Sequence, residues 1–210
     1  MKLLLKTVAF GAIAAALTAC SSVDTVTRNT PLETPRVGVQ AETQILRDYS
    51  LQSIRFAIPT DMRVSEANSY YPIADIVWRG DPLGNRGQQI NDIFQTSITA
   101  AGEGLTGARA VTVDVELARF HSLTERTRYS VGGVHSIKFD LTIRDALTGE
   151  VIEPTRRINA DLPALGGYAA LAADNAGQGQ KVRITTHLTS LFFSELTGLT
   201  GSVANAPADT

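Results

Sequence analysis

Cysteine is almost absent from this sequence: Cys20 is the single cysteine among 210 residues. A disulfide within the chain is therefore excluded, even in an oxidising compartment. The sequence beyond residue 20 also has no cysteine nucleophile. A free thiol exported to such a compartment would be a liability, so the place of Cys20 near the N-terminus needs a specific explanation.

The sequence also lacks a P-loop and a G-x-S-x-G nucleophile elbow, the signatures of common phosphate-binding and serine-hydrolase sites. It has no excess of basic residues, since 19 Lys and Arg stand against 21 Asp and Glu, for a net charge of −2. Such a mildly acidic chain gives no reason to expect a nucleic-acid partner or a polybasic lipid-binding patch.

The N-terminus has the pattern of a secretory signal peptide. Lys2 and Lys6 precede an apolar run over residues 8–16. This run is far shorter than the ~20 residues that a helix needs to cross a bilayer. We therefore assign residues 1–19 to a signal peptide and leave them out of the fold prediction.

The four residues that end this segment, Leu17-Thr18-Ala19-Cys20, resemble the lipobox of bacterial lipoproteins. The resemblance implies cleavage between Ala19 and Cys20 and a diacylglycerol thioether on Cys20. It also implies three acyl chains, such as palmitate, which together hold a protein stably at a membrane. We predict this covalent lipid and no other cofactor. Cleavage removes Lys2 and Lys6, so the mature chain has a net charge of −4.

The mature chain divides into three parts. Residues 20–47 are polar without an apolar period, and we predict a tether that follows the lipidated N-terminus. Residues 48–197 form a single predicted periplasmic domain. Residues 198–210 are small and polar, which predicts a disordered tail.

Alternating apolar and polar residues predict strands, and an apolar stripe predicts helices. The predicted strands cover residues 51–58, 111–117 and 137–143, with a further strand ending near 158–162; the predicted helices cover 85–101 and 181–196. Residues 163–180 read as an ordered loop with one short helix. The β-α-β-β-β-α order predicts an α+β two-layer sandwich, in which helices pack on one face of a mostly antiparallel, four-stranded sheet.

Two short motifs match known sites by letter only. The segment Gly102-Glu103-Gly104-Leu105-Thr106-Gly107 has the G-x-G-x-x-G spacing of dinucleotide sites. A predicted helix precedes it and a strand follows, so helix carbonyls rather than amides would face a phosphate, and we interpret the glycines as a helix stop and a turn. Arg79-Gly80-Asp81 spells an adhesion tripeptide, but three common residues often match by chance, and Pro82 indicates a turn.

Three histidines are candidates for a site. His121 and His135 continue the inward parity of strands 111–117 and 137–143, and His187 lies on the apolar stripe of the last helix. With Glu125 close by, the three imidazoles would then converge on a zinc or pH-sensing site. The alternative is that each histidine lies at the core rim and bonds to backbone. No H-x-H or H-E-x-x-H spacing supports a metal, so we predict no metal site and keep these four residues as weak candidates.

Charged residues gather in two further places. Glu125, Arg126, Arg128 and Tyr129 form a charged loop, and Arg156-Arg157 lie on the third of the consecutive strands. They are able to bind an anionic head group or an acidic partner. A solvated strand face explains them equally well, and we favour it because the net charge is not basic.

Residues 65–82, 119–133 and 177–185 together resemble a family of uncharacterised envelope lipoproteins from Gram-negative bacteria, the alphaproteobacteria in particular. The resemblance implies no activity, so no catalytic residue can be transferred. More distantly, the order of elements resembles that of envelope lipoproteins that serve as accessory subunits of transport or assembly machines, which is an analogy of fold alone.

Two functions remain open. The first is a membrane-anchored periplasmic lipoprotein, not an enzyme, that binds a protein partner or a ligand as an accessory of the cell envelope. The alternative is a periplasmic enzyme or metal-binding protein that uses a site built from His121, His135 and Glu125. We favour the first because the sequence has an anchor and a tether but no catalytic signature.

Residue 21 is Ser rather than Asp, which in lipoproteins that resemble this one favours export to the outer membrane. We therefore predict that the domain lies at the periplasmic face of the outer membrane. A Ser21→Asp variant should fractionate with the inner membrane on a density gradient, whereas an unchanged location would remove the argument.

Overall fold

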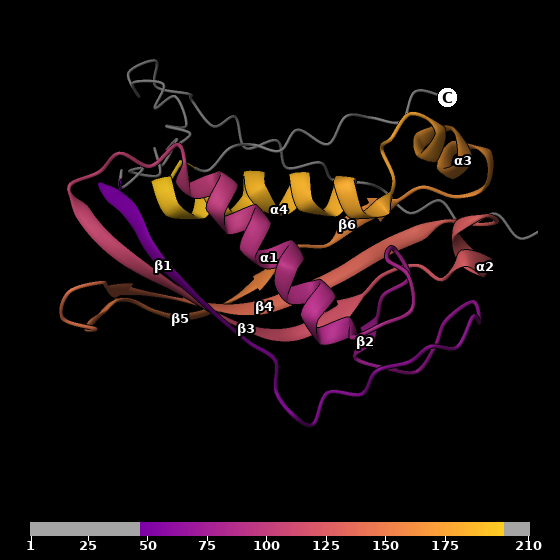
Figure 1. Ribbon diagram of the computed structural model, residues 1–210, viewed down its shortest axis with the longest axis horizontal. Coiled ribbons are helices and arrows are strands. Elements are labelled where there is room, and N and C mark those ends of the chain that lie inside the picture. Colours follow the sequence, from indigo (N-terminus) through magenta and orange to yellow (C-terminus); the bar gives the residue numbers. More distant parts are fainter. Residues whose placement is uncertain (1–46, 200–210) are drawn as a thin grey trace, which may run out of the picture. The chain divides into compact units, whose positions relative to one another are not determined.

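A computed structural model of the chain describes residues 47–199 (Figure 1). Its strands are β1 (Tyr49–Ala57), β2 (Ile76–Val77), β3 (Arg109–His121), β4 (Gly133–Asp145), β5 (Val151–Asn159) and β6 (Leu162–Ala164). Its helices are α1 (Arg86–Gly102), α2 (Glu125–Arg128), α3 (Gly167–Asn175) and α4 (Gln180–Thr197). The signal peptide, Cys20, the tether up to residue 46 and the tail from residue 200 lie outside the described residues. Between residues 47 and 199, no helix is both long enough and apolar enough to cross a bilayer.

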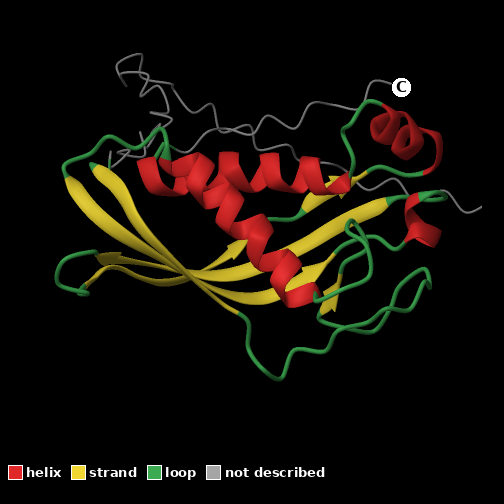
Figure 2. Cartoon of the chain, in the orientation of Figure 1, coloured by secondary structure: helices red, strands yellow, loops and turns green. Residues whose placement is uncertain are grey.

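The described strands form one mixed, six-stranded sheet (Figure 2). The order is β1-β3-β4-β5, with β2 beside β3 and β6 beside β4. β1 and β2 run parallel to β3, whereas the β3–β4, β4–β5 and β4–β6 pairs are antiparallel. The prediction of a mostly antiparallel, four-stranded sheet is therefore wrong, and the fold of this part of the chain is mixed α/β with four helices.

The parallel pairing of β1 with β3 follows from the connection between them. The chain passes through α1 before it enters β3. A strand–helix–strand crossover returns the chain to the end of the sheet from which it left, so the two strands run in the same direction. The close approach at this end requires Gly107, since a Cβ there would lie 2.1 Å from the backbone of Asp48. The interpretation of the glycine motif as a helix stop is confirmed, because α1 ends at Gly102.

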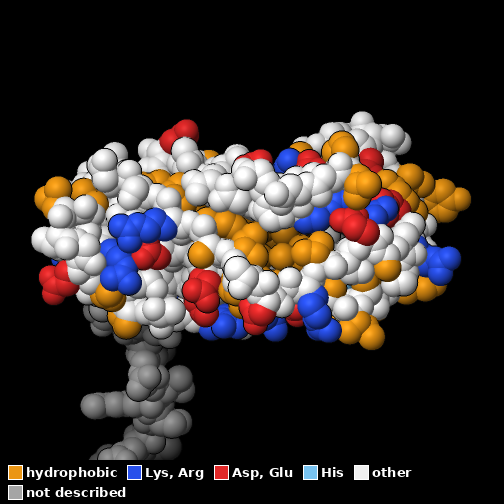
Figure 3. Space-filling model, turned by 60° about the horizontal axis from the view of Figure 1, so that its bottom comes forward, with side chains coloured by type: hydrophobic (Ala, Val, Ile, Leu, Met, Phe, Trp, Pro, Cys, Tyr) orange, Lys and Arg blue, Asp and Glu red, His pale blue; other side chains and the backbone are white. Residues whose placement is uncertain are grey.

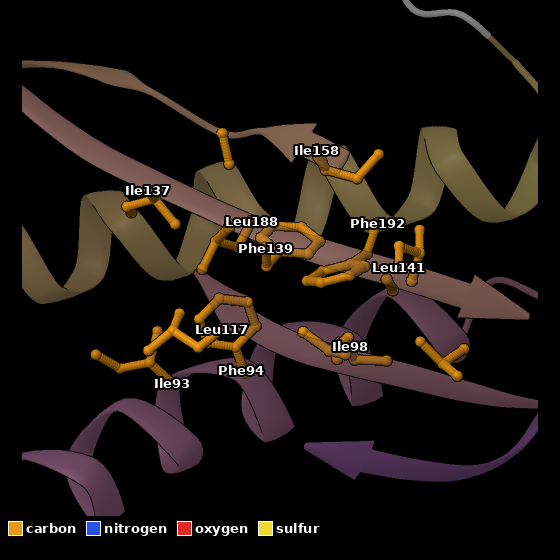
Figure 4. Close-up of a cluster of buried hydrophobic side chains, with 14 of the residues drawn as sticks. Ile93, Phe94, Ile98, Leu117, Ile137, Phe139, Leu141, Ile158, Leu188 and Phe192 are labelled. Carbon is orange, nitrogen blue, oxygen red and sulfur yellow. The ribbon is translucent and has the colours of Figure 1, made fainter. Parts of the chain in front are cut away.

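Helices α1 and α4 cover one face of the sheet, and the core lies between the two layers (Figure 4). On α4 the fully buried residues recur every fourth position: Ile184, Leu188, Phe192 and Leu196. Leu191, beside Phe192 on the helix, is only partly buried. One helix stripe thus packs on the strands while a neighbouring stripe stays accessible.

Phe94 of α1 lies at the centre of this core. Its ring centroid is 4.7 Å from that of Phe56, 5.3 Å from Phe139, 6.1 Å from Phe192 and 6.4 Å from Phe120. These rings come from β1, β3, β4 and α4, so a single side chain of α1 joins most of the fold. Offset and edge-to-face pairs of this kind add to the hydrophobic effect of burial.

The opposite face of the sheet is polar. On this face, polar side chains of β3, β4 and β5 bond to one another. Arg144 donates to Asp114 at 2.7 Å, and Arg157 donates to Asp140 at 2.9 Å. The hydroxyls of Thr142 and Thr155 are 2.7 Å apart. Arg157 thus lies on a solvated strand face, as predicted. Neighbouring Arg156 points to the helix side instead and pairs there with Glu195 of α4.

A β-bulge interrupts β3 and changes which side chains face the core. Leu117 pairs with Phe139, but Arg119 pairs with Lys138, so Ala118 is an extra residue without a partner on β4. Side chains alternate between the two faces of a strand, so one extra residue moves every later side chain to the opposite face. Phe120 therefore takes the core position, and His121 lies on the outer face.

We expect Phe94→Ala to lower the free energy of unfolding by about 3–5 kcal/mol, because it removes a buried ring and leaves a cavity. Urea unfolding followed by circular dichroism measures the loss. The matched control is Phe193→Ala on the accessible side of α4, which should cost less than about 1 kcal/mol. Equal losses in the two variants would contradict the central place of Phe94.

Candidate functional site

The three histidines do not converge as the sequence predicted. His121 lies beyond the Ala118 bulge, on the face of the sheet away from the helices, so the prediction that it faces inward is wrong. It is buried there by the loop between β1 and β2. Its ring stacks on Tyr71 with centroids 4.7 Å apart, and its Nε2 is 2.9 Å from the carbonyl oxygen of Pro72. His121 therefore fixes a loop.

His135 does face the helices, where it joins a buried hydrogen-bonded chain. Ser122 Oγ donates to Gln180 Oε1 at 3.1 Å, and His135 Nδ1 is 2.9 Å from the same Oγ. A hydroxyl has one proton, so His135 must donate from Nδ1 to Ser122. In this tautomer Nδ1 cannot accept the serine proton, which is the step that would activate a nucleophile.

His187 and Glu125 have other surroundings. His187 lies on α4, where burial lowers its pKa and a backbone bond to Ala160 opposes the shift. Its Nε2 is buried and has no hydrogen-bond partner among the described residues. Glu125 begins α2 and accepts from Arg79 Nε at 2.9 Å. Between residues 47 and 199, no three His, Cys, Asp or Glu side chains are grouped so that they would hold a metal ion.

The tripeptide Arg79-Gly80-Asp81 is engaged within the fold. Asp81 accepts from Trp78 Nε1 and from Lys181 Nζ, each at 2.8 Å. A Cβ on Gly80 would lie 2.2 Å from the Trp78 ring. The segment therefore packs against a buried tryptophan, and its charged groups bond to other parts of the domain.

The charged segment at residues 125–129, predicted as a loop, forms the short helix α2 and binds its neighbours. Arg128 pairs with Asp174 of α3, and the Tyr129 hydroxyl is 3.3 Å from the same carboxylate. The guanidinium of Arg126 lies 5.3 Å from the ring centroid of Tyr70 and has no carboxylate partner among the described residues. Of the basic residues in this segment, Arg126 thus remains accessible for an outside contact.

Eight of the fifteen exposed large hydrophobic side chains in the described residues lie at one end of the sheet, in the β1–β2 loop, around α2 and on α3. We call this set the exposed end: Tyr70, Tyr71, Ile73, Tyr129, Val131, Val134, Tyr168 and Leu171. Ile73 is 84% exposed and Tyr168 is 91% exposed. Figure 3 shows that hydrophobic side chains reach the surface on one face of the molecule, in a central hollow and at one side. Patches of this kind mark interaction surfaces.

Specific bonds hold the three segments of the exposed end together. Thr124 and Thr127, at the start of α2, donate to the carbonyl oxygens of Ser69 and Tyr70 at 2.8 and 2.7 Å. On the other side, the backbone approaches so closely that a Cβ on Gly166 would lie 2.2 Å from the Gly132 nitrogen. These contacts fix the backbone of the three segments from which the exposed aromatic side chains project.

The chain enters the domain at the other end. The Arg47 N–H donates to the Thr197 carbonyl oxygen at 3.1 Å, where α4 finishes. The first residue of α4, Gln180, bonds to Ser122 near α2. The 18 residues of α4 span ~27 Å, so about this distance separates the point of entry from the exposed end (Figure 1).

A groove with a volume of about 840 Å³ runs beside α4. We call it the α4 groove. Ser97 of α1 bonds to the Thr185 carbonyl oxygen on one flank of α4, and the groove lies along another. It is lined by Arg47, Arg156, Leu162, Gln178, Arg183, Thr186, His187, Ser190, Leu191, Ser194, Glu195 and Gly198.

Sequence reasoning found neither the exposed end nor the α4 groove. For the exposed end, the available signal was a pair of aromatic residues, Tyr70 and Tyr71, in a segment without apolar period. For the groove, it was Arg183 in the first turn of a helix, where acidic residues are usual. Neither signal distinguishes a binding surface from an ordinary loop or helix face.

Burial, together with the positive charges of Arg183 and Arg128, lowers the pKa of His135 from 6.5 to about 3. Below pH 6.5 the unfolded chain takes up a proton at His135 while the native chain does not. Stability should therefore fall as the pH drops from 7 to 5, by up to about 1.4 kcal/mol per pH unit from this group. In His135→Asn, the free energy of unfolding measured with urea should depend less steeply on pH. The control Ser122→Ala should lose stability at every pH and keep the slope; an unchanged slope in His135→Asn would disprove the assignment.

Comparisons with known proteins gave two solved structures with low similarity and one matching family. A solved protein from Xanthomonas campestris, of the family DUF330, has 11% identity, with 73% of this chain and 86% of that chain covered and a TM-score of 0.43. A candidate lipoprotein from Caulobacter crescentus has 14% identity, with 69% and 87% covered and a TM-score of 0.32. No curated protein matches the sequence. The family model of DUF6778 matches residues 49–208, so the chain belongs to this family of unknown function.

Proposed function

We propose that this chain is a lipid-anchored envelope lipoprotein that docks a protein partner through its exposed end and catalyses no reaction. One observation carries the proposal. Eight exposed large hydrophobic side chains lie together at the end of the domain opposite to Arg47, where the chain enters. A domain tethered at one end then presents an apolar, aromatic surface at the other.

The chemistry of the exposed end suits a protein partner. Tyr and Arg are enriched at the energetic centres of protein interfaces. Two such pairs occur here: Arg126 stacks on Tyr70, and Arg119 donates to the Tyr71 hydroxyl at 2.9 Å. Neither arginine has a carboxylate partner among the described residues. We therefore expect a partner surface with an apolar pocket and acidic residues around it.

The anchor and tether complete the proposal. Lipid on Cys20 would hold the chain at the membrane, and the 26 residues between Cys20 and Arg47 would reach up to ~90 Å when fully extended. Ser21 beside the lipidated residue favours the outer membrane. The exposed end would then meet a partner that stands in or projects into the periplasm.

The alternative function, an enzyme or metal site at His121, His135 and Glu125, has less support. His121 and His135 lie on opposite faces of the sheet. Glu125 is neutralised by Arg79, and the hydroxyl nearest His135 bonds to Gln180. The Ser122 hydroxyl therefore does not have in His135 Nδ1 a base that accepts its proton.

Site-specific photo-crosslinking in living cells tests the proposal. A benzophenone amino acid at Ile73 or Val131 should give one discrete crosslinked product with the lipidated protein. The same amino acid at Leu147 should give none, although Leu147 is 91% exposed. Leu147 lies in the β4–β5 turn, remote from the exposed end, and is therefore the matched control.

A second variant decides whether the product reflects docking. Arg126→Glu reverses the one exposed charge that stacks on Tyr70, and it should reduce the crosslinked fraction at Ile73 by about tenfold while thermal stability stays the same. Equal crosslinking at Ile73 and Leu147, or a product that Arg126→Glu leaves unchanged, would contradict docking at this end.

A further inference from the structure

The α4 groove extends along most of α4. The lining residues contributed by α4 run from Arg183 to Gly198 along one stripe of the helix. Fifteen residues of helix extend ~22 Å. The opposite wall comes from Arg156 of β5 and Leu162 of β6, the two strands that pair in succession with β4. An elongated groove of this kind fits an extended chain better than a compact ring.

The middle of the groove is apolar and continuous with the core. Leu162 and Leu191 are partly buried and pack against the core cluster on one side while they line the groove on the other. Burial of apolar surface gains roughly 25 cal/mol per Å². A hydrocarbon chain laid against these two side chains would therefore be stabilised without any change in the packing below them.

Positive charge is balanced at one end of the groove and unbalanced at the other. Near the end of α4, Arg47 pairs with Glu153 and Arg156 pairs with Glu195. At the beginning of α4, Arg183 bonds only to the Pro163 carbonyl oxygen, at 3.0 Å, among the partners that residues 47–199 provide. An unpaired guanidinium is a bidentate donor for carboxylate and phosphate.

The surroundings of Arg183 favour an anion further. Arg183 is partly buried, and the charge of Arg128 lies close enough that both factors lower the pKa of Arg183. One turn further along α4, the buried Nε2 of His187 has no hydrogen-bond partner among the described residues. The other ring nitrogen donates to the backbone of Ala160, and burial keeps the ring neutral, so Nε2 is an acceptor that a hydroxyl of a head group would satisfy. A buried polar atom without a partner is costly and is normally satisfied by a ligand or by water.

We propose that the α4 groove binds a single-chain lipid with an anionic head group. The head group binds at Arg183 and the acyl chain lies along Leu162 and Leu191. One leaflet of a bilayer is ~15 Å of hydrocarbon, half of the ~30 Å core, and a chain of this length fits within the groove. No residue of the exposed end lines this groove, although Arg183 bonds to Pro163, which pairs with Val134.

Calorimetry with two lipids of equal chain length tests the proposal. The protein is the full mature chain with Cys20→Ser, which removes the anchor's own acyl chains from the measurement. Myristoyl lysophosphatidylglycerol, titrated below its micelle concentration, should bind with a 1:1 stoichiometry. Myristoyl lysophosphatidylcholine has the same phosphate, but its choline cation cancels the net charge of the head group. It should bind about tenfold more weakly, because the positive charges of Arg183 and Arg128 repel this cation.

Three variants and one further ligand make the test specific. Arg183→Gln should lower the affinity for the phosphatidylglycerol lipid to that for the phosphatidylcholine lipid. Arg157→Gln, on the outer face, should leave both affinities unchanged. Ser190 is an exposed position in the groove wall, and Ser190→Trp should abolish the binding of both lipids without loss of thermal stability. Equal affinity for the two lipids, binding unaffected by Arg183→Gln, or equally tight binding of inorganic phosphate alone would overturn the proposal.

Discussion

The packing of Phe94 against β3, β4 and α4 is the interaction on which the rest of the structure depends. The long antiparallel pair β3–β4 has one strongly apolar face, and α1 and α4 bury it by placing Phe94 and Phe192 over Phe139. Since α1 also connects β1 to β3, its position fixes the parallel first strand. One flank of α4 is not covered by this packing and lines the α4 groove.

The Ala118 bulge determines which side chains at the end of β3 face the core and which face outward. Before the bulge, the alternation of β3 matches its sequence pattern; after it, the pattern is inverted, and Phe120 takes the core position. His121 is turned to the outer face, where it stacks on Tyr71 and bonds to Pro72. The bulge therefore secures the β1–β2 loop, which supplies three residues of the exposed end.

Charge is used differently in the two regions that we consider functional. Within the α4 groove, Glu153 and Glu195 neutralise two of the three arginines and leave Arg183 free. At the exposed end, Asp174 neutralises Arg128 and leaves Arg126 on Tyr70. In both regions the unpaired guanidinium lies beside apolar or aromatic surface. This combination supports both proposals and separates them from the solvated face that holds Arg157.

The sequence by itself determined the main elements, because the alternation in β3 and β4 and the apolar stripes of α1 and α4 are local patterns. It also supplied the lipobox at Cys20, which lies outside the described residues and remains a prediction. Only the tertiary structure decided the parallel pairing of β1, the outward turn of His121 and the convergence of three segments at the exposed end. These depend on contacts between residues far apart in the chain: one unpaired residue in a strand, or one arginine without a carboxylate, leaves no periodic signal in the sequence.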